Sequence, residues 1–386
     1  MKIAVLKELL AGETRSALIP ANVPQLAKAG LEVVVEAGAG EAAGFVDQDY
    51  VDKGATIATS LAEALDAQLL LKVRAAGADV DDGAEVFAML RPEHITIASC
   101  DPLGSPFAIQ EWATSGSTLF SLELIPRITR AQSMDVLSSQ ATIAGYRAVL
   151  LAAAQQNRLF PMMMTAAGTL PAAKLFVIGA GVAGLQAIAT ARKLGAVVSA
   201  YDVRPACREQ VESLGAKFVE LDLATEQSED KGGYAKAMDE DFYRRQREQL
   251  ADVISQHDVV VSTAAIPGKK SPLLITEDAV QRMPRGGTIV DLAALRGGNC
   301  ELSQLDQTTL IHGVTIIAPS NIEAGAACHA SQMLGNNAVK FLLNMIKDGE
   351  LHLDLEDEII SHTRVTADGS ITSDRVRESL GETAAT

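Results

Sequence analysis

A glycine-rich turn between residues 179 and 184 has the spacing of a dinucleotide-binding fingerprint. It reads GAGVAG, follows the apolar run KLFVI and opens a segment of helical pattern over 183–194. Such glycines allow a tight turn and let the backbone approach a pyrophosphate, whose charge is favoured at a helix N-terminus. An acidic residue ends the next predicted strand, where its carboxylate can accept hydrogen bonds from ribose hydroxyls. The expected chemistry is nucleotide binding, by Gly179, Gly181, Val182, Ala183, Gly184 and Asp202.

The residues around that acidic strand end indicate which nucleotide is bound. The carboxylate of Asp202 repels a 2′-phosphate and so favours NAD(H) over NADP(H). Arg204 is the alternative signal, because an arginine at this place can hold such a phosphate. We predict NAD(H), with Asp202, Val203 and Arg204 at the ribose.

A second candidate lies in the polar stretch RITRAQSMDVLSSQ, residues 127–140, just before an apolar helical segment. One interpretation is a capped helix N-terminus, because serine and aspartate favour that position. The other interpretation is a ligand-binding loop, because many different hydrogen-bonding groups stand in few positions. Composition leaves both open for Arg127, Arg130, Gln132, Asp135, Ser138, Ser139 and Gln140.

Bulk properties exclude several other classes of function. A net charge of −16 over 386 residues argues against a nucleic-acid partner, which needs clustered lysine and arginine. The longest apolar run, residues 175–191, is broken by glycines and is short for a membrane span, so we expect none. The six histidines and four cysteines lack metal-ligand spacing, so we expect no metal and reduced thiols.

The elements that must position these residues alternate between strands and helices. Six strands are predicted before residue 125, from KIAVL, LEVVVE, QLLLKV, EVFAML, ITIAS and STLFSLE, with helices such as NVPQLAKAG between them. The pattern restarts with KLFVI and continues through VVSAYDV, KFVEL, VVVSTA, TIVDLA and TIIAP. Alternation of this kind predicts parallel α/β sheets.

The fold class is therefore α/β, with two Rossmann-like doubly wound domains and a nucleotide cleft between them. We place the first domain at 1–137 plus 330–386, the latter including a returning helix, and the NAD(H)-binding domain at 138–329. Residues 223–240, which contain Gly233 and Tyr234, interrupt the alternation. They are either a solvated insertion or a mobile lid.

Longer motifs resemble the NAD-binding part of proton-translocating nicotinamide nucleotide transhydrogenases. They are RITRAQSMDVLSSQATIAGYRAV, FPMMMTAAGTLPAAK, GAGVAGLQAIATARKLGAVV and GGYAKAM. The N-terminal KELLAGETRSALIPANVPQLAKAG resembles an opening that these enzymes share with alanine dehydrogenase. The resemblance implies hydride transfer from NADH to NADP⁺ on a partner component, coupled to proton translocation.

The resemblance also implies roles for single residues. Arg127, Asp135 and Ser138 would hold the nicotinamide amide, with Ser133 and Met134 beside them, and Gln132 would project toward the partner's nucleotide. The other contacts implied are Gly233 and Tyr234, over the adenosine side, and Thr263 and Ala264, in the crevice at the strand ends.

Alanine dehydrogenase is the rival family. Its chemistry on a 2-oxo acid needs an arginine, a lysine and a histidine acid/base. Arg15 and Lys72 match, but Cys100 and Asp101 stand where that family has its histidine region, and His94 precedes the strand. A module that binds NAD(H) only as a sensor is a third hypothesis.

The resemblance finally predicts partners and a location. The chain ends at Thr386, before the membrane helices of longer transhydrogenase chains, which favours the separate alpha-1 subunit of a three-subunit bacterial enzyme. We expect it in the cytoplasm, at the inner face of the plasma membrane. Its expected partners are a membrane subunit, an NADP(H)-binding subunit and a second copy of itself.

Overall fold

The computed structural model describes residues 1–79, 83–223, 239–266, 268–347 and 349–381. The chain divides into two compact units, of which the first comprises Met1–Gln140 and Glu323–Thr386 and the second Ala141–Ile322. The expected boundaries stood at 137/138 and 329/330. Helix α6, Val136–Gln155, runs from the first unit into the second, and the 3-10 helix η8, Ile322–Ala326, marks the return.

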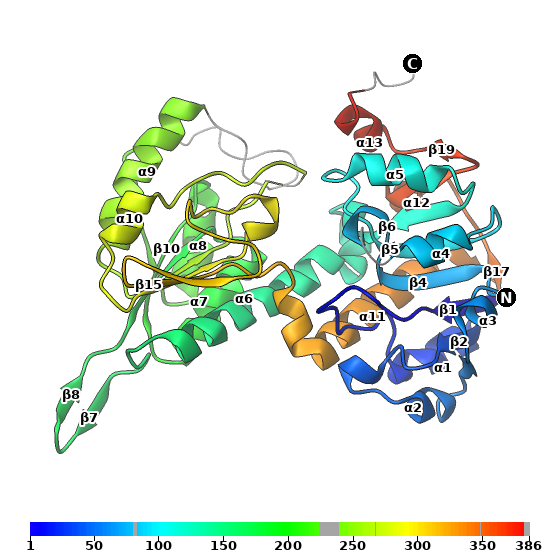
Figure 1. Ribbon diagram of the computed structural model, residues 1–386, viewed down its shortest axis with the longest axis horizontal. Helices are drawn as coiled ribbons and strands as arrows, with labels where there is room; N and C mark the ends of the chain where they lie inside the picture. The colour runs from blue at the N-terminus through cyan, green and yellow to red at the C-terminus, as the bar shows by residue number, and fades with distance from the viewer. Residues whose placement is uncertain (80–82, 224–238, 267, 348, 382–386) are drawn as a thin grey trace. The chain divides into compact units, whose positions relative to one another are not determined.

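Unit 1 contains an eight-stranded sheet whose parallel part has the doubly wound order (Figure 1). Across the sheet the strands are β19 (Ser370–Ile371), β18 (Arg364–Ala367), β6 (Thr118–Ser121), β5 (Ile95–Ser99), β4 (Leu69–Arg74), β1 (Lys2–Val5), β2 (Glu32–Glu36) and β3 (Thr56–Ala58). Strands β18 and β19 are antiparallel additions at one edge. The strand order reverses at β1, so the switch point lies between β1 and β4.

Successive residues of the strands in unit 1 face opposite sides of the sheet, and each side is covered by helices. Ile3 and Val5 pack with α1 (Val23–Lys28), α11 (Ala327–Met345) and α12 (Glu358–Thr363). On the other face lie α3 (Leu61–Ala64), α4 (Ala84–Ala88), α5 (Pro106–Ala113) and α13 (Asp374–Ser379). Helix α2 (Asp47–Val51) and the short pair β16 (Ile346–Lys347) and β17 (Glu350–Leu351) complete the unit.

Unit 2 repeats the same strand order with seven strands. They are β11 (Lys217–Phe218), β10 (Val197–Tyr201), β9 (Lys174–Ile178), β12 (Val259–Ser262), β13 (Thr288–Asp291), β15 (Val314–Ile317) and β14 (Thr308–Ile311). Only β14 is antiparallel to its neighbour among the described strands of this sheet. Both sheets thus confirm the predicted class of two Rossmann-like doubly wound folds.

Helices also cover both faces of the sheet in unit 2. One face packs on α6, α7 (Val182–Lys193) and α8 (Arg208–Ser213), the other on α9 (Glu240–Ile254) and α10 (Glu277–Gln281). A hairpin of β7 (Met163–Thr165) and β8 (Gly168–Leu170) extends away from this sheet (Figure 1).

One predicted strand is wrong. EVFAML, residues 85–90, lies at helix α4, between the adjacent parallel strands β4 and β5. A parallel connection needs a crossover, which is usually a helix, so a strand there would leave the two ends unjoined. Val86 is buried while Glu85 and Ala88 are exposed, which is the pattern of a surface helix.

Candidate nucleotide-binding site

The glycine turn joins β9 to α7, and each glycine has its own physical reason. Gly179 has a φ of +94°, and a Cβ there would lie 2.7 Å from Thr263 Oγ1. At Gly184 a Cβ would lie 1.8 Å from the carbonyl oxygen of Gly179, so only glycine lets the helix pack on the turn. At Gly181, by contrast, a Cβ would meet nothing within 4 Å. The open side of the turn therefore lies at Gly181, where a ligand can approach the backbone.

Helix α7 begins at this open position. Gly181 is its N-cap, with extended backbone, and the first bond within the helix runs from the amide of Leu185 to the carbonyl of Gly181. In any α-helix the amides of the first turn have no carbonyl acceptor inside the helix. The amides of Val182, Ala183 and Gly184 hold those positions here. They suit a diphosphate, since the positive end of the helix dipole lies there too.

Asp202, directly after β10, is buried and paired. Its Oδ2 accepts a bond of 2.7 Å from the amide of Ala180 and its Oδ1 one of 2.8 Å from the amide of Arg204. The Arg204 guanidinium donates to both carboxylate oxygens, from Nε at 2.9 Å and from Nη2 at 2.8 Å. The cation that could have held a 2′-phosphate therefore faces a carboxylate of its own turn.

Thr263 and Ala264 follow β12 and line the carboxyl edge of the same sheet. The Thr263 hydroxyl donates to the Gly179 carbonyl at 2.9 Å, which ties this segment to the glycine turn. Asn299 holds the segment from below: its side chain accepts from Ser262 and the Ala264 amide and donates to the Ala264 carbonyl. Asn299 is fully buried, and Asp291 in turn accepts from its amide at 2.8 Å.

Sequence reasoning missed Asn299 and Asp291. A signal existed for Asp291, which ends a strand at the carboxyl edge as Asp202 does. Asn299 stands in the turn RGGNC and carried no comparable signal.

In unit 1 the polar stretch 127–140 divides into parts with different tasks. Asp135 caps α6, accepting from the Ser138 amide at 2.9 Å and from its hydroxyl at 2.6 Å, so the capping interpretation holds for this pair. The preceding 3-10 helix η5, Thr129–Met134, buries Met134 in the core and leaves Gln132 and Ser133 exposed. Arg127 is exposed as well. A loop with a capped end and exposed polar groups remains available to a ligand.

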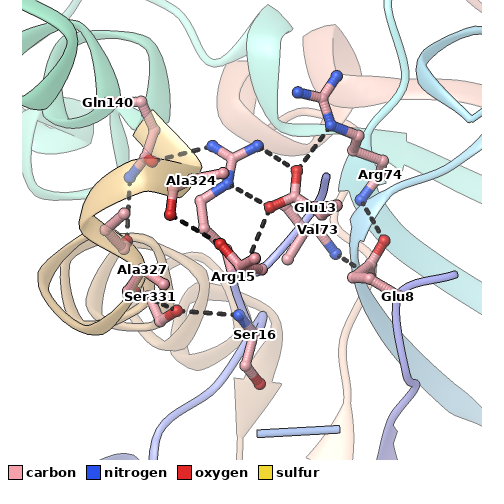
Figure 2. Close-up of polar contacts among 12 residues, drawn as sticks. Glu8, Glu13, Arg15, Ser16, Val73, Arg74, Gln140, Ala324, Ala327 and Ser331 are labelled. Carbon is pink, nitrogen blue, oxygen red and sulfur yellow. Dashed lines mark hydrogen bonds and ion pairs between the residues drawn. The ribbon is translucent and has the colours of Figure 1, made fainter. Parts of the chain in front are cut away.

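A charge cluster lies at the switch point of the sheet in unit 1 (Figure 2). The Arg15 guanidinium donates to both oxygens of Glu13, at 2.8 and 2.6 Å, and to Gln140 at 3.0 Å. Arg74 adds a bond of 2.8 Å to Glu13. Burial alone would raise the pKa of Glu13, but the bonds and charges of Arg15 and Arg74 lower it to about 2.

The other carboxylates of the cluster are less well compensated. Glu8 accepts the Val73 amide at 2.7 Å, and burial raises its pKa to about 7 although Lys72 opposes the shift. Lys72 itself donates to Asp79 at 2.8 Å, and both side chains are buried. Both cations that a 2-oxo acid would need are thus paired with internal carboxylates.

The histidine that such chemistry requires is also elsewhere. His94 is buried before the amino end of β5, where its ring nitrogens contact the Arg91 amide and the Leu65 carbonyl. At the carboxyl end of β5 stands Cys100, whose fully buried thiol has a pKa raised by burial.

Two predictions fall outside what the structure describes. Gly233 and Tyr234 belong to residues 224–238, which lie outside the described ranges, as does most of the segment 223–240. Within the described ranges there is no group of three or more metal-binding side chains. No described helix is both long and apolar enough to cross a membrane.

Doubly wound sheets with this glycine turn and acidic strand end define a dinucleotide-binding protein of the oxidoreductase type. Residues 4–144 match the model of the alanine dehydrogenase/PNT N-terminal domain, and residues 148–374 that of the C-terminal domain. The first of the two parts of NAD(P) transhydrogenase subunit alpha from Rhodospirillum rubrum is 45% identical over 375 residues, covering 96% of this chain and 97% of that protein.

Solved structures agree. A crystal structure of transhydrogenase from Sinorhizobium meliloti has a TM-score of 0.86 at 44% identity, covering 96% of this chain and 100% of that one. Alanine dehydrogenase of Bacillus subtilis is more distant, at 25% identity over 389 residues, 99% of this chain and 95% of that protein. The chain therefore belongs to the alanine dehydrogenase/PNT family, alongside the NAD(P) transhydrogenase alpha subunits, and the predicted resemblance is confirmed.

Proposed function

We propose that the chain is the NAD(H)-binding component of a proton-translocating NAD(P) transhydrogenase. The observation that carries the proposal is the open backbone at Gly181, at the start of α7, beside the Asp202–Arg204 pair. Its 45% identity to a transhydrogenase subunit supports the choice of reaction. When bound, the nucleotide supplies a hydride that passes directly to NADP⁺ on a separate component.

Residues of unit 2 would hold the nucleotide. The first-turn amides of α7 face the pyrophosphate, and Asp202 accepts from the ribose hydroxyls. Thr263 and Ala264 form the wall at the ends of the strands, which Asn299 keeps in place. The pairing of Arg204 with Asp202 favours NAD(H) over NADP(H), because this pair leaves no uncompensated cation for a 2′-phosphate.

The polar loop of unit 1 would position the nicotinamide. Arg127, Asp135 and Ser138 hold the carboxamide, and Gln132, which is exposed, points to the nucleotide of the partner. Movement of a hydride alone needs no acid or base, so these groups act by fixing geometry and excluding water.

An amino-acid dehydrogenase is the second candidate, because the family and the match of Arg15 and Lys72 allow it. The charge cluster opposes it. Arg15 is held by Glu13 and Gln140 and Lys72 by Asp79, while the expected histidine position is taken by Cys100.

A mixing experiment tests the proposal. Hydride transfer from NADH to an NADP⁺ analogue is measured with the chain alone, and again with a purified NADP(H)-binding component. We expect transfer only on mixing and no NAD⁺ reduction with L-alanine. Turnover with L-alanine would establish the dehydrogenase, and NADH binding without transfer in the mixture would favour a sensor.

The variant Asp135→Asn tests the role of the loop. Asparagine caps helices as well as aspartate, so the fold and the melting temperature should change little. Hydride transfer should fall by about tenfold or more while the NADH dissociation constant changes far less. Equal losses in rate and binding would contradict a positioning role.

We also propose the assembly that this function requires. The chain would act as a homodimer at the inner face of a bacterial plasma membrane, beside a membrane subunit and an NADP(H)-binding subunit. Coupling to proton movement then belongs to the complex.

A further inference from the structure

Three residues of α11 lie on one face of the helix at a regular spacing. Ala330, Asn337 and Asn344 are seven residues apart, so each step is about two turns, or about 10.5 Å along the axis. All three contact the polar stretch 127–140, which runs in the opposite direction along this face. The helix and the stretch belong to the same unit.

Asn337, at the middle of the face, is the central contact. Its amide nitrogen donates to the Ser133 carbonyl at 2.8 Å, and its oxygen accepts from the Ser139 hydroxyl at 2.6 Å. The side chain is 8% exposed. It therefore joins η5, on one side of Asp135, to the first turn of α6 on the other side.

The two ends of the face fix the stretch further. Gln140 donates to the Ala330 carbonyl at 3.1 Å. Arg130 donates to Asn344 at 3.2 Å and to both oxygens of Asp357, at 2.9 and 2.6 Å. These bonds lower the pKa of Asp357 well below its usual range, which keeps its carboxylate charged.

These contacts divide the stretch into an anchored side and an exposed side. Arg130, Ser139 and Gln140 bond to α11 and its neighbours, whereas Gln132 is exposed between them. Both the nitrogen and the oxygen of the Asn337 side chain are directed at the stretch. The face of α11 thus sets the height and register of the segment that carries Gln132 and Asp135.

We propose that Asn337 and the Arg130–Asp357 pair are positioning residues for hydride transfer. The inference rests on the proposed function, in which Gln132 and Asp135 meet the nicotinamide. A displacement of reacting atoms by about 1 Å can slow a reaction about 100-fold without loss of binding. Residues that fix the loop should therefore affect the transfer rate far more than affinity for NADH.

The test compares Asn337→Ala with Asn336→Ala. Asn336 is the matched control, because it lies on the same helix, is exposed and bonds to Asn22 at 2.8 Å instead of the loop. With a transhydrogenase NADP(H)-binding component, single-turnover hydride transfer and the NADH dissociation constant are measured for both. We expect Asn337→Ala to slow transfer about tenfold or more, with affinity changed less than about threefold, and Asn336→Ala to change neither.

A second variant tests the other anchor and guards against misfolding at the buried site. Asp357→Asn keeps the α12 cap, which accepts from the Ile359 amide, but removes the charge that holds Arg130. Because Arg130 is half exposed, the pair contributes little to stability. We expect a folded variant with slower transfer and unchanged NADH affinity.

The outcomes separate the two proposals. No transfer by the unaltered chain with any NADP(H)-binding component, despite NADH binding, would overturn the proposed function. Normal transfer by folded Asn337→Ala and Asp357→Asn, with the unaltered chain active, would overturn only the positioning inference. A parallel fall in rate and affinity in both variants would overturn it too, since it would show a general loss of the site.

Discussion

At the residue scale, the Asp202–Arg204 pair makes nucleotide choice testable. Replacing Asp202 with alanine removes the ribose acceptor and releases the Arg204 guanidinium from both of its bonds to the carboxylate. NADH affinity should fall about tenfold or more, while NADPH affinity should rise relative to it, because an arginine released in this way can hold a 2′-phosphate. Fluorescence titration with both nucleotides measures the ratio.

Arg204→Ala is the control for this prediction. It keeps the Asp202 carboxylate, so the preference for NADH should persist. An unchanged NADH/NADPH ratio in Asp202→Ala would show that selectivity lies elsewhere.

Also at the residue scale, Glu8 should make stability depend on pH. Its folded pKa of about 7 exceeds the ordinary 4.5, so between these values the folded chain binds more protons than the unfolded chain. Stability should therefore fall as pH rises through this window, by about 1–3 kcal/mol for this group. Glu13, whose pKa is lowered to about 2, contributes in the opposite sense and only below pH 4.5.

The measurement is chemical denaturation at pH 5 and pH 8 for the natural chain and for Glu8→Gln. Glu123 and Glu323 also have pKa values raised by burial, so the difference between the two chains isolates Glu8. The variant should lose less stability at high pH. An identical pH dependence would contradict the raised pKa.

At the element scale, the β9–α7 turn separates folding from binding. A Cβ at Gly184 would overlap the Gly179 carbonyl, so Gly184→Ala should lower the melting temperature by several degrees. A Cβ at Gly181 has open space, so Gly181→Ala should fold normally and lose NADH affinity about tenfold, because the methyl group blocks the approaching pyrophosphate. Normal NADH binding by Gly181→Ala would place the phosphates elsewhere.

The same scale shows how far sequence reaches. The glycine turn and Asp202 were predictable because strand, turn, helix and acidic strand end are local and ordered in the chain. The helix over 85–90 was not, because a short apolar run fits a strand or a surface helix equally well. Asn299 and Asn337 act on segments 35 and 204 residues away, and no local pattern records such pairings.

At the scale of the whole molecule, the β7–β8 hairpin is a natural candidate for the proposed dimer contact. Met162, Met163, Met164 and Leu170 on it are exposed, up to 78% at Met164. Exposed apolar side chains gathered on one arm favour association with a second copy. Replacing Met163 and Met164 with serine should weaken self-association about tenfold or more in sedimentation velocity.

Met89→Ser provides the comparison, since Met89 is a single exposed methionine on the surface near α4. It should leave the association unchanged. A hairpin variant that associates as the natural chain does would exclude the hairpin as the contact.

The whole account depends on direct transfer between two nicotinamides, and an isotope label tests that most directly. NADH carrying deuterium at the transferred C4 position is mixed with this chain and an NADP⁺-loaded NADP(H)-binding component, and the NADPH formed is analysed by mass spectrometry. The account predicts that the deuterium appears in the NADPH, because no acid, base or solvent proton intervenes. NADPH without the label, or label released to water, would contradict it.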